Sequence, residues 1–369
     1  MQVTGAIGAG QVLTLSYKVQ VKPGVTSGTR FCITSTLRFD VNNDGTFDST
    51  SSVDTCFTAN CPPAANPNAR PPASSTDDQK TGSVLFFNLY SSNASNPNVE
   101  NTRISITNID ESRTAYVHLF LVDGNTCSVA GSYVCLTPAQ TLSFLVSDID
   151  PGVMGYVVAV VVDKNTGYPT NFNSLAGDEY VKLASGHAAN LKAETFAAMA
   201  GLPTANNATA ATLKFDGVSY EAAPRVLALD NIASSADSNT TLLVINPVDG
   251  DLVTGGSAIN TGAMSGLLFD DQESGLSFTS TSSACQFKST LSNGFPRTTP
   301  RFSAAIVSGH SGWMKLWSAE DRGLLGAIIN ATPHAGRSPQ AFNGGHNLHM
   351  LKLTPSSRLT IPVIAPACQ

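Results

Sequence analysis

Short apolar segments rich in β-branched residues recur about every ten to twenty residues along this chain, separated by Asn, Asp, Gly and Pro. The longest, Tyr156–Val162, has the length of a strand and is far below the ~18 apolar residues of a membrane-spanning helix. This pattern predicts an all-β protein. The predicted strands are 84–89, 103–108, 115–122, 140–146, 155–163, 213–215, 225–229, 240–246, 277–278, 301–307, 313–317, 324–330, 348–353 and 358–363.

One segment departs from the strand pattern. Residues 188–200 are rich in Ala, place Leu191, Phe196 and Met199 broadly on one side, and are followed by Gly201 and Pro203. These are the features of a short helix and its end. The predicted fold is therefore all-β, with tandem β-sandwich modules of Ig-like or jelly-roll-like type and one short helix near 188–200.

The first 60 residues are too few for a complete two-sheet sandwich, which takes about 100. We therefore predict five segments. These are a partial Ig-like β module at 1–60, a Pro-rich linker at 61–81, a β-sandwich at 82–202, a second linker at 203–212 and a second β-sandwich at 213–369. Residues 101–108 are similar to 239–246, which indicates either a duplication or the convergence of similar strands on Asn-ended turns.

Charge and cysteine use restrict the setting of the protein. The net charge is −6, from 21 Lys and Arg against 27 Asp and Glu, so there is no basic footprint for nucleic acid or anionic membranes. The seven cysteines include no C-x2-C pair of the zinc-site type. We predict the disulfides Cys32–Cys56 and Cys127–Cys135, and hence an oxidising compartment. Three cysteines are left without an assigned partner, namely Cys61, Cys285 and Cys368.

The beginning of the chain lacks the basic and apolar regions of a signal peptide. The chain is therefore expected to be either cytosolic or a mature or truncated piece, and the missing start of the first module favours the second. The short first module would be either the tail of a tandem array or an incomplete sandwich that is completed within an assembly.

Two resemblances support an extracellular setting. Residues 12–60, with Cys32, the loop 39–45 and Cys56, resemble the end of the Ig-like conserved repeat domains found in tandem on bacterial surface proteins. Residues 79–200 are similar to an uncharacterised group of secreted bacterial β-proteins. That similarity rests on the motifs at 78–85, 117–124, 147–152 and 177–182. The resemblances imply a bacterial cell-surface or secreted protein and no particular activity.

The acidic loop between Cys32 and Cys56 is the strongest candidate metal site. It carries oxygen ligands at the loop positions of an EF-hand-type sequence, with Gly45 at the sharp turn. The predicted calcium ligands are Asp40, Asn42, Asp44, the Thr46 carbonyl and Asp48. Calcium is the one cofactor predicted, and a polar turn between two strands is the alternative.

Three further groups of residues suggest weaker sites. Trp313 and Trp317 lie at i and i+4 on one strand face and would form a small sugar-stacking platform, or pack in the core. His346 and His349 would point to opposite faces of a single strand, which argues against a shared metal. Residues 309–313 match the nucleophile elbow of esterases at two of three fixed positions, with Trp in place of the last glycine.

These features predict a non-enzymatic, secreted or cell-surface structural or adhesion protein. We expect it to self-associate as a subunit of an extracellular assembly such as a filament or surface layer. The alternative is a carbohydrate-binding or glycan-active extracellular β-protein, with a glycan as its partner. We expect neither nucleic acid nor a membrane span.

Overall fold

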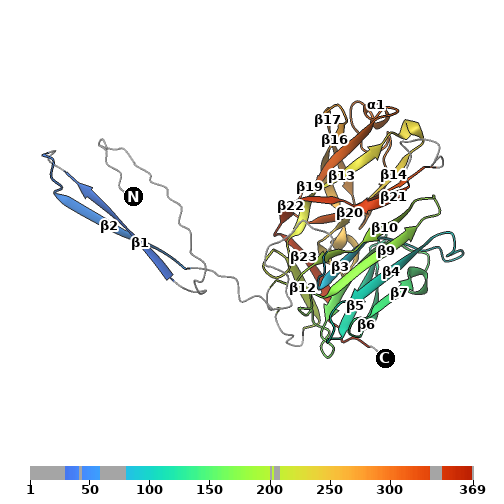
Figure 1. Ribbon diagram of the computed structural model, residues 1–369, viewed down its shortest axis with the longest axis horizontal. Coiled ribbons are helices and arrows are strands. Elements are labelled where there is room, and N and C mark those ends of the chain that lie inside the picture. Colours follow the sequence, from blue (N-terminus) through green and yellow to red (C-terminus); the bar gives the residue numbers. More distant parts are fainter. Residues whose placement is uncertain are drawn as a thin grey trace. The chain divides into compact units, whose positions relative to one another are not determined.

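A computed structural model of the chain describes residues 30–40, 44–58, 80–199, 202, 208–332 and 343–367. The chain divides into two compact units, Met1–Ala64 and Ala65–Gln369 (Figure 1).

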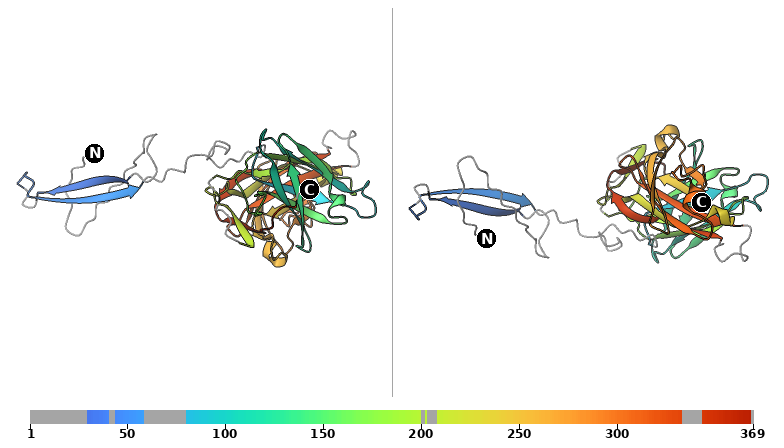
Figure 2. Two further views of the ribbon diagram at one scale, coloured as in Figure 1. Left: turned by 90° about the horizontal axis from the view of Figure 1, so that it is seen from below. Right: turned by 90° about the horizontal axis from the view of Figure 1, so that it is seen from above.

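In the first unit, the described residues form a two-stranded antiparallel sheet of β1 (Arg30–Phe39) and β2 (Ser49–Thr58). Figure 2 shows these strands side by side in both views. Cys32 lies directly opposite Cys56, and the two form a disulfide with a Cα–Cα distance of 4.1 Å. The predicted Cys32–Cys56 pair is thus confirmed. The resemblance of this unit to an Ig-like repeat stays a prediction.

The described part of the second unit contains five sheets, numbered I to V here. Sheet I has the strand order β10 (Ala188–Lys192), β9 (Leu175–Lys182), β4 (Asn101–Asn108) and β7 (Thr141–Leu145). Sheet II has the order β11 (Glu194–Phe196), β3 (Val84–Ser91), β8 (Met154–Val162), β5 (Ala115–Asp123) and β6 (Val129–Leu136). Sheet III has the order β12 (Ala210–Phe215), β23 (Ser357–Pro362) and β15 (Gly250–Asp251).

The last two sheets come from the second half of the chain. Sheet IV has the order β17 (Gly275–Ser282), β16 (Gly262–Asp270), β19 (Ser311–Ser318), β13 (Ala223–Ala233) and β22 (His349–Thr354). Sheet V has the order β18 (Phe287–Thr290), β14 (Thr240–Pro247), β20 (Leu324–Ala331) and β21 (Gly344–Asn347). The helical elements of the described chain are η1 (Val146–Asp148), η2 (Ser235–Asp237), η3 (Gly256–Ile259) and α1 (Phe302–Ala305).

The five sheets share their buried cores in a closed sequence. One core lies between sheets I and II, a second joins sheet II to sheet III and to the edge of sheet IV, a third lies between IV and V, and a fourth joins V to I. The second unit therefore has the arrangement of a five-bladed β-propeller with small sheets.

The prediction of tandem β-sandwich modules is wrong, although the all-β class is correct. The finding that overturns it is the sharing of apolar cores between the two halves. Leu191 of β10, for example, packs in one cluster with Leu242 of β14 and Ile329 of β20. Strand patterns reveal which residues are buried but not which distant strand buries them, so this assembly of sheets could not be read from the sequence.

The two halves of the second unit repeat one strand order. Strands β3 to β11 form the orders 11-3-8-5-6 and 10-9-4-7, and the second half repeats them as 22-13-19-16-17 and 21-20-14-18. β8 corresponds in this repeat to β19, and β3 to β13. The similarity of residues 101–108 to 239–246 had two explanations, duplication and convergence. A duplication would produce this shared strand order.

Two local predictions are wrong. Residues 188–200 contain β10 and β11 in place of a helix, since burial of Ala189 and Leu191 alternates with exposure of Asn190 and Lys192. Pairing with β9 overrides the helical propensity of Ala. The predicted strand 301–307 instead contains α1. By contrast, the prediction that 117–122 is a central strand is confirmed, because β5 lies between β8 and β6 and both of its faces are buried.

Cys127 pairs with Cys285, so the predicted hairpin disulfide Cys127–Cys135 is wrong. The Cα–Cα distance is 5.5 Å, and 158 positions separate the two cysteines in the sequence. Cys127 has a positive φ of 63°, in the loop between β5 and β6. The disulfide therefore joins sheet II covalently to the loop that precedes β18. Cys61 and Cys368 lie outside the described residues.

A buried cluster of side-chain amides also joins the halves. Asn246 of β14 donates to the backbone carbonyl of Asn88 at 2.9 Å, and Gln286 donates to the same carbonyl at 3.1 Å. Asn88 in turn donates to the side-chain oxygen of Asn347 at 3.1 Å. Because buried amides without partners are costly, these bonds fix the register of one half on the other.

Candidate functional site

The outward face of sheet IV carries both tryptophans of the protein. Burial alternates along β19, so Trp313, Lys315 and Trp317 point outward while Met314 and Leu316 lie in the core. Trp313 stacks on Phe269 of β16, with ring centroids 4.5 Å apart and an interplanar angle of 10°. Trp313 remains 38% exposed. We call the outward side chains of Phe269, Trp313, Lys315 and Trp317 the aromatic face.

The repeat provides a reference for this face. Relative to the paired strand, Trp313, Lys315 and Trp317 of β19 occupy the places of Tyr156, Val158 and Val160 in β8. The three β8 residues are fully buried, in the core shared with sheet III. At the equivalent β19 positions Trp313 is exposed and Lys315 and Trp317 are half-buried, and these side chains are aromatic or cationic. The same surface thus has a packing role in the first half and remains available in the second.

A β-bulge beside Trp313 redirects an acidic side chain. Leu229 pairs with Met314 and Ile232 with Gly312, so Asp230 and Asn231 together oppose Trp313. Asn231 adopts a positive φ of 57°, a conformation that Asn tolerates better than most residues. Bulges of this kind commonly re-aim side chains next to binding or catalytic sites.

Asp230 meets two histidines at the bulge. Its Oδ1 lies 3.0 Å from Nε2 of His346, and its Oδ2 lies 3.4 Å from Nε2 of His349. One ligand atom from each of the three residues can be chosen so that all lie within 4.8 Å of one another. We call these three residues the His–Asp cluster. It is the one group of three or more His, Cys, Asp or Glu side chains with this spacing in the described part of the chain.

The expectation that His346 and His349 point apart is wrong, because they do not share a strand. His346 belongs to β21 of sheet V and His349 begins β22 of sheet IV. The chain passes from one sheet to the other at Leu348, whose side chain is buried in the core between them. This crossing brings both rings to Asp230. Only an assignment of strands to sheets could have revealed it.

The acidic loop of the first unit retains its predicted turn. Gly45 has a φ of 89°, as expected for a glycine at a sharp turn. The carboxylate of Asp40 accepts hydrogen bonds from the backbone N–H groups of Asp44 at 3.2 Å and Gly45 at 2.8 Å. Thr46 donates from its backbone and hydroxyl to Asp44 Oδ1. Asp48 lies in the same loop, and Asn42 lies outside the described residues. Calcium binding stays a prediction here.

The esterase alternative gains no support from the geometry. Ser311 opens β19 opposite Ala233, and a strand follows it where the elbow requires a helix. An esterase triad would combine Ser311 with Asp321 and His334, which follow it in the chain. The carboxylate of Asp321 accepts hydrogen bonds from the hydroxyls of Thr354 at 2.9 Å and Ser356 at 2.7 Å. His334, the third member of that triad, lies outside the described residues.

Two buried titratable groups have structural surroundings. The ring of His118 lies between those of Phe120 and Tyr133, and burial lowers the pKa of its imidazole to about 4. Burial raises the pKa of the Glu179 carboxyl well above its usual value, although the backbone N–H of Leu89 donates to Oε1 at 3.2 Å. Burial thus favours the neutral form of both groups, which fits packing better than catalysis.

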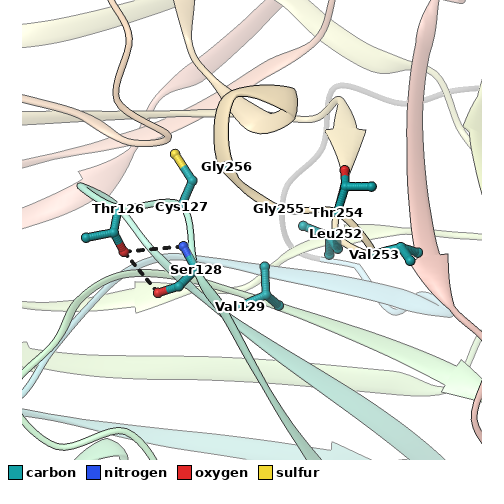
Figure 3. Close-up of a pocket in the computed structure, with 9 residues that line it drawn as sticks. All are labelled: Thr126, Cys127, Ser128, Val129, Leu252, Val253, Thr254, Gly255 and Gly256. Atoms are coloured by element: carbon teal, nitrogen blue, oxygen red, sulfur yellow. Dashed lines mark hydrogen bonds between the residues drawn. The ribbon is translucent and has the colours of Figure 1, made fainter.

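A shallow pocket of about 390 Å³ lies beside the Cys127–Cys285 disulfide. Residues 126–129 line one side and 252–256 the other, and Thr126 is hydrogen-bonded to Ser128 across its rim (Figure 3). All nine lining residues belong to the described chain, and none offers a titratable side chain, since Cys127 is in the disulfide. The pocket lining therefore holds no base that could activate the hydroxyls of Thr126, Ser128 or Thr254.

Comparison with protein-family models finds no match for this chain, and no curated protein is significantly similar to it in sequence. Within the described residues, no helix has the length and apolar character needed to cross a membrane. The aromatic face and the adjoining His–Asp cluster are therefore the features on which a functional argument can rest.

Proposed function

We propose that the protein is an extracellular adhesion protein that binds carbohydrate on the aromatic face. The observation that carries this proposal is the exposed Phe269–Trp313 stack, flanked by Lys315 and Trp317 on the same face. Flat aromatic rings with polar neighbours suit a sugar ring, because its C–H groups pack on the rings while its hydroxyls find hydrogen-bonding partners.

The replacement pattern supports recognition over packing. At the equivalent places of β8 the side chains are Tyr156, Val158 and Val160, which suit a buried face. Lys315 would be costly to bury there without a partner. Trp313, in contrast, is 38% exposed and forms a contiguous aromatic surface with Phe269, and such surfaces commonly mark binding sites.

The cysteines support the extracellular part of the proposal. The disulfides Cys32–Cys56 and Cys127–Cys285 require an oxidising environment to form and persist. The low charged fraction of 13% also suits a secreted β-protein whose sheets are coated by uncharged polar side chains.

A glycan-array screen tests the proposal. The wild-type protein is expected to bind at least one glycan class, and Trp313→Ala and Trp317→Ala are expected to lose it. Tyr180→Ala is the matched control, because Tyr180 is 43% exposed on the outward face of sheet I. The absence of any glycan signal, or a signal that survives both tryptophan variants, would overturn the proposal.

Self-association is a second candidate function for the same face. In the first half, the face of β8 that corresponds to the aromatic face is covered by sheet III. A β-sheet can therefore pack on a face of this kind. A second copy of the chain would cover the exposed Trp313 and Leu351 of sheet IV, as a subunit of an assembly. Light scattering across a concentration series should then detect oligomers that Leu351→Lys reduces. A strict monomer at the highest concentration would exclude this candidate.

A further inference from the structure

We propose that the His–Asp cluster of Asp230, His346 and His349 binds a divalent transition-metal ion. The proposal does not depend on carbohydrate binding, because it rests on ligand geometry and is tested without any glycan.

The spacing of the donor atoms fits a common ion. Two ligand atoms that each lie about 2.1 Å from one metal are about 3.0 Å apart at a right angle and about 3.4 Å apart at the tetrahedral angle. The distances from the Asp230 oxygens to Nε2 of His346 and of His349 are 3.0 Å and 3.4 Å. Each histidine therefore lies at a ligand-like distance from one oxygen of Asp230, and one ligand atom from each of the three residues lies within 4.8 Å of the others.

The hydrogen bonding of His346 supports a ligand role. Its Nδ1 lies 2.8 Å from the backbone carbonyl oxygen of Asn347, which can only accept, so Nδ1 carries the proton. In the neutral ring, Nε2 then presents a lone pair to Asp230 Oδ1, which also presents one. Two acceptors cannot bond to each other, whereas a cation between them satisfies both. Proteins commonly fix a metal-binding histidine by this Nδ1 contact.

The supports on either side are rigid. Leu348, between the two histidines, is 2% exposed in the core of sheets IV and V. His346 pairs with Ile328 in the regular β20–β21 ladder, and His349 pairs with Ala228 in the β13–β22 ladder. The bulge in β13 holds Asp230. Binding would therefore order little additional chain, which keeps its entropic cost low.

The donor set and exposure define the class of metal. Two imidazoles and one carboxylate suit zinc, cobalt, nickel, copper, manganese or ferrous iron, whereas calcium prefers oxygen ligands. The side chains of Asp230, His346 and His349 are 59%, 38% and 57% exposed. Water or an external ligand would thus complete the coordination, as in metal sites that keep open positions.

Calorimetric titration of tag-free, EDTA-treated protein with ZnCl₂ tests the proposal. One Zn²⁺ per chain is expected, and His349→Asn and Asp230→Asn should each weaken binding by about 100-fold or more. His310→Asn is the matched control, because His310 makes a similar exposed contact of 2.8 Å with Asp271 but belongs to no three-residue ligand group within the described residues. Asp40→Asn separates this site from the predicted calcium loop and should leave zinc binding unchanged.

A second measurement and two contrary results complete the test of zinc binding. Nitrogen NMR of the wild-type rings removes any dependence on the folding of variants, since Zn²⁺ should shift Nε2 of His346 and His349 and leave His310 unchanged. Absence of zinc uptake would overturn the proposal and leave the contacts as imidazolium–carboxylate pairs. Zinc binding that persists unchanged in folded His349→Asn and Asp230→Asn would overturn it equally.

Discussion

The Cys127–Cys285 disulfide should contribute strongly to the stability of the second unit. Its removal by the double substitution Cys127→Ala and Cys285→Ala frees a loop of 158 positions in the unfolded chain. In the chain-entropy model such a crosslink contributes about 5 kcal/mol at 25 °C. The pairing Cys127–Cys135, with 135 − 127 = 8 positions, would contribute only about 2.5 kcal/mol. The two pairings therefore differ in measurable stability.

Urea unfolding followed by tryptophan fluorescence measures this effect selectively. Both tryptophans, Trp313 and Trp317, lie in the second unit, so the signal reports that unit alone. The double variant should lose up to about 5 kcal/mol, which corresponds to a fall in Tm of up to about 8 °C for a unit of this size. Alanine keeps the Cβ at the positive φ of Cys127, so backbone strain is the same in both proteins.

The first unit provides an internal control. Cys32→Ala with Cys56→Ala opens a loop of 24 positions in the other unit and should leave the tryptophan-detected transition unchanged. The reasoning would be refuted if the Cys127/Cys285 double variant unfolded at the wild-type urea concentration. It would also be refuted if a non-reduced digest linked Cys127 to Cys135.

Three further predictions concern the second unit. Because the pKa of Glu179 is raised in the folded state, the free energy of unfolding should fall by about 1.4 kcal/mol per pH unit between the unfolded pKa near 4.5 and the folded pKa. Glu179→Gln should remove this pH dependence in urea titrations between pH 5 and 8. The same pH dependence in both proteins would contradict the prediction. His118 has the opposite sign, since its lowered pKa makes its contribution complete above pH 6.5 and lost as pH falls through about 4, and an NMR titration midpoint above 6 would be inconsistent with this. Gly155→Ala should destabilise the folded state by about 1–3 kcal/mol or more, because the added Cβ would lie 1.8 Å from the carbonyl oxygen of Val122. The control is Gly294→Ala, where the added Cβ would have its nearest contact at 3.5 Å. Equal melting temperatures of the two variants would disprove the clash.

Local features of the fold followed from the sequence. The run 117–122 is apolar at every position, so its place inside a sheet could be predicted, and β5 confirms it. Cys32 and Cys56 flank a short polar loop, and a hairpin places them opposite each other. Where a pattern was ambiguous, prediction was wrong: Ala-rich residues 188–200 fit a helix until pairing with β9 is known.

The candidate site depended on contacts that are distant in sequence. Trp313 was recognised as a possible platform from the spacing of the tryptophans, but its stacking partner Phe269 was not. The role of Asp230 could not be predicted from the sequence, because a β-bulge is recognised only once the pairing with the opposite strand is known. His346 and His349 were rejected as a pair, since a continuous strand was assumed through Leu348.

The sequence by itself determined the all-β class, most strand positions and the disulfide that closes the first hairpin. These follow from side-chain alternation and turn chemistry, which act over a few neighbouring residues. Tertiary structure alone decided the five-sheet arrangement, the partner of Cys127 and which copy of the repeated face remains open. Those outcomes depend on which apolar surfaces bury one another across more than a hundred residues, and two strands with equally good patterns can satisfy that requirement in different sheets.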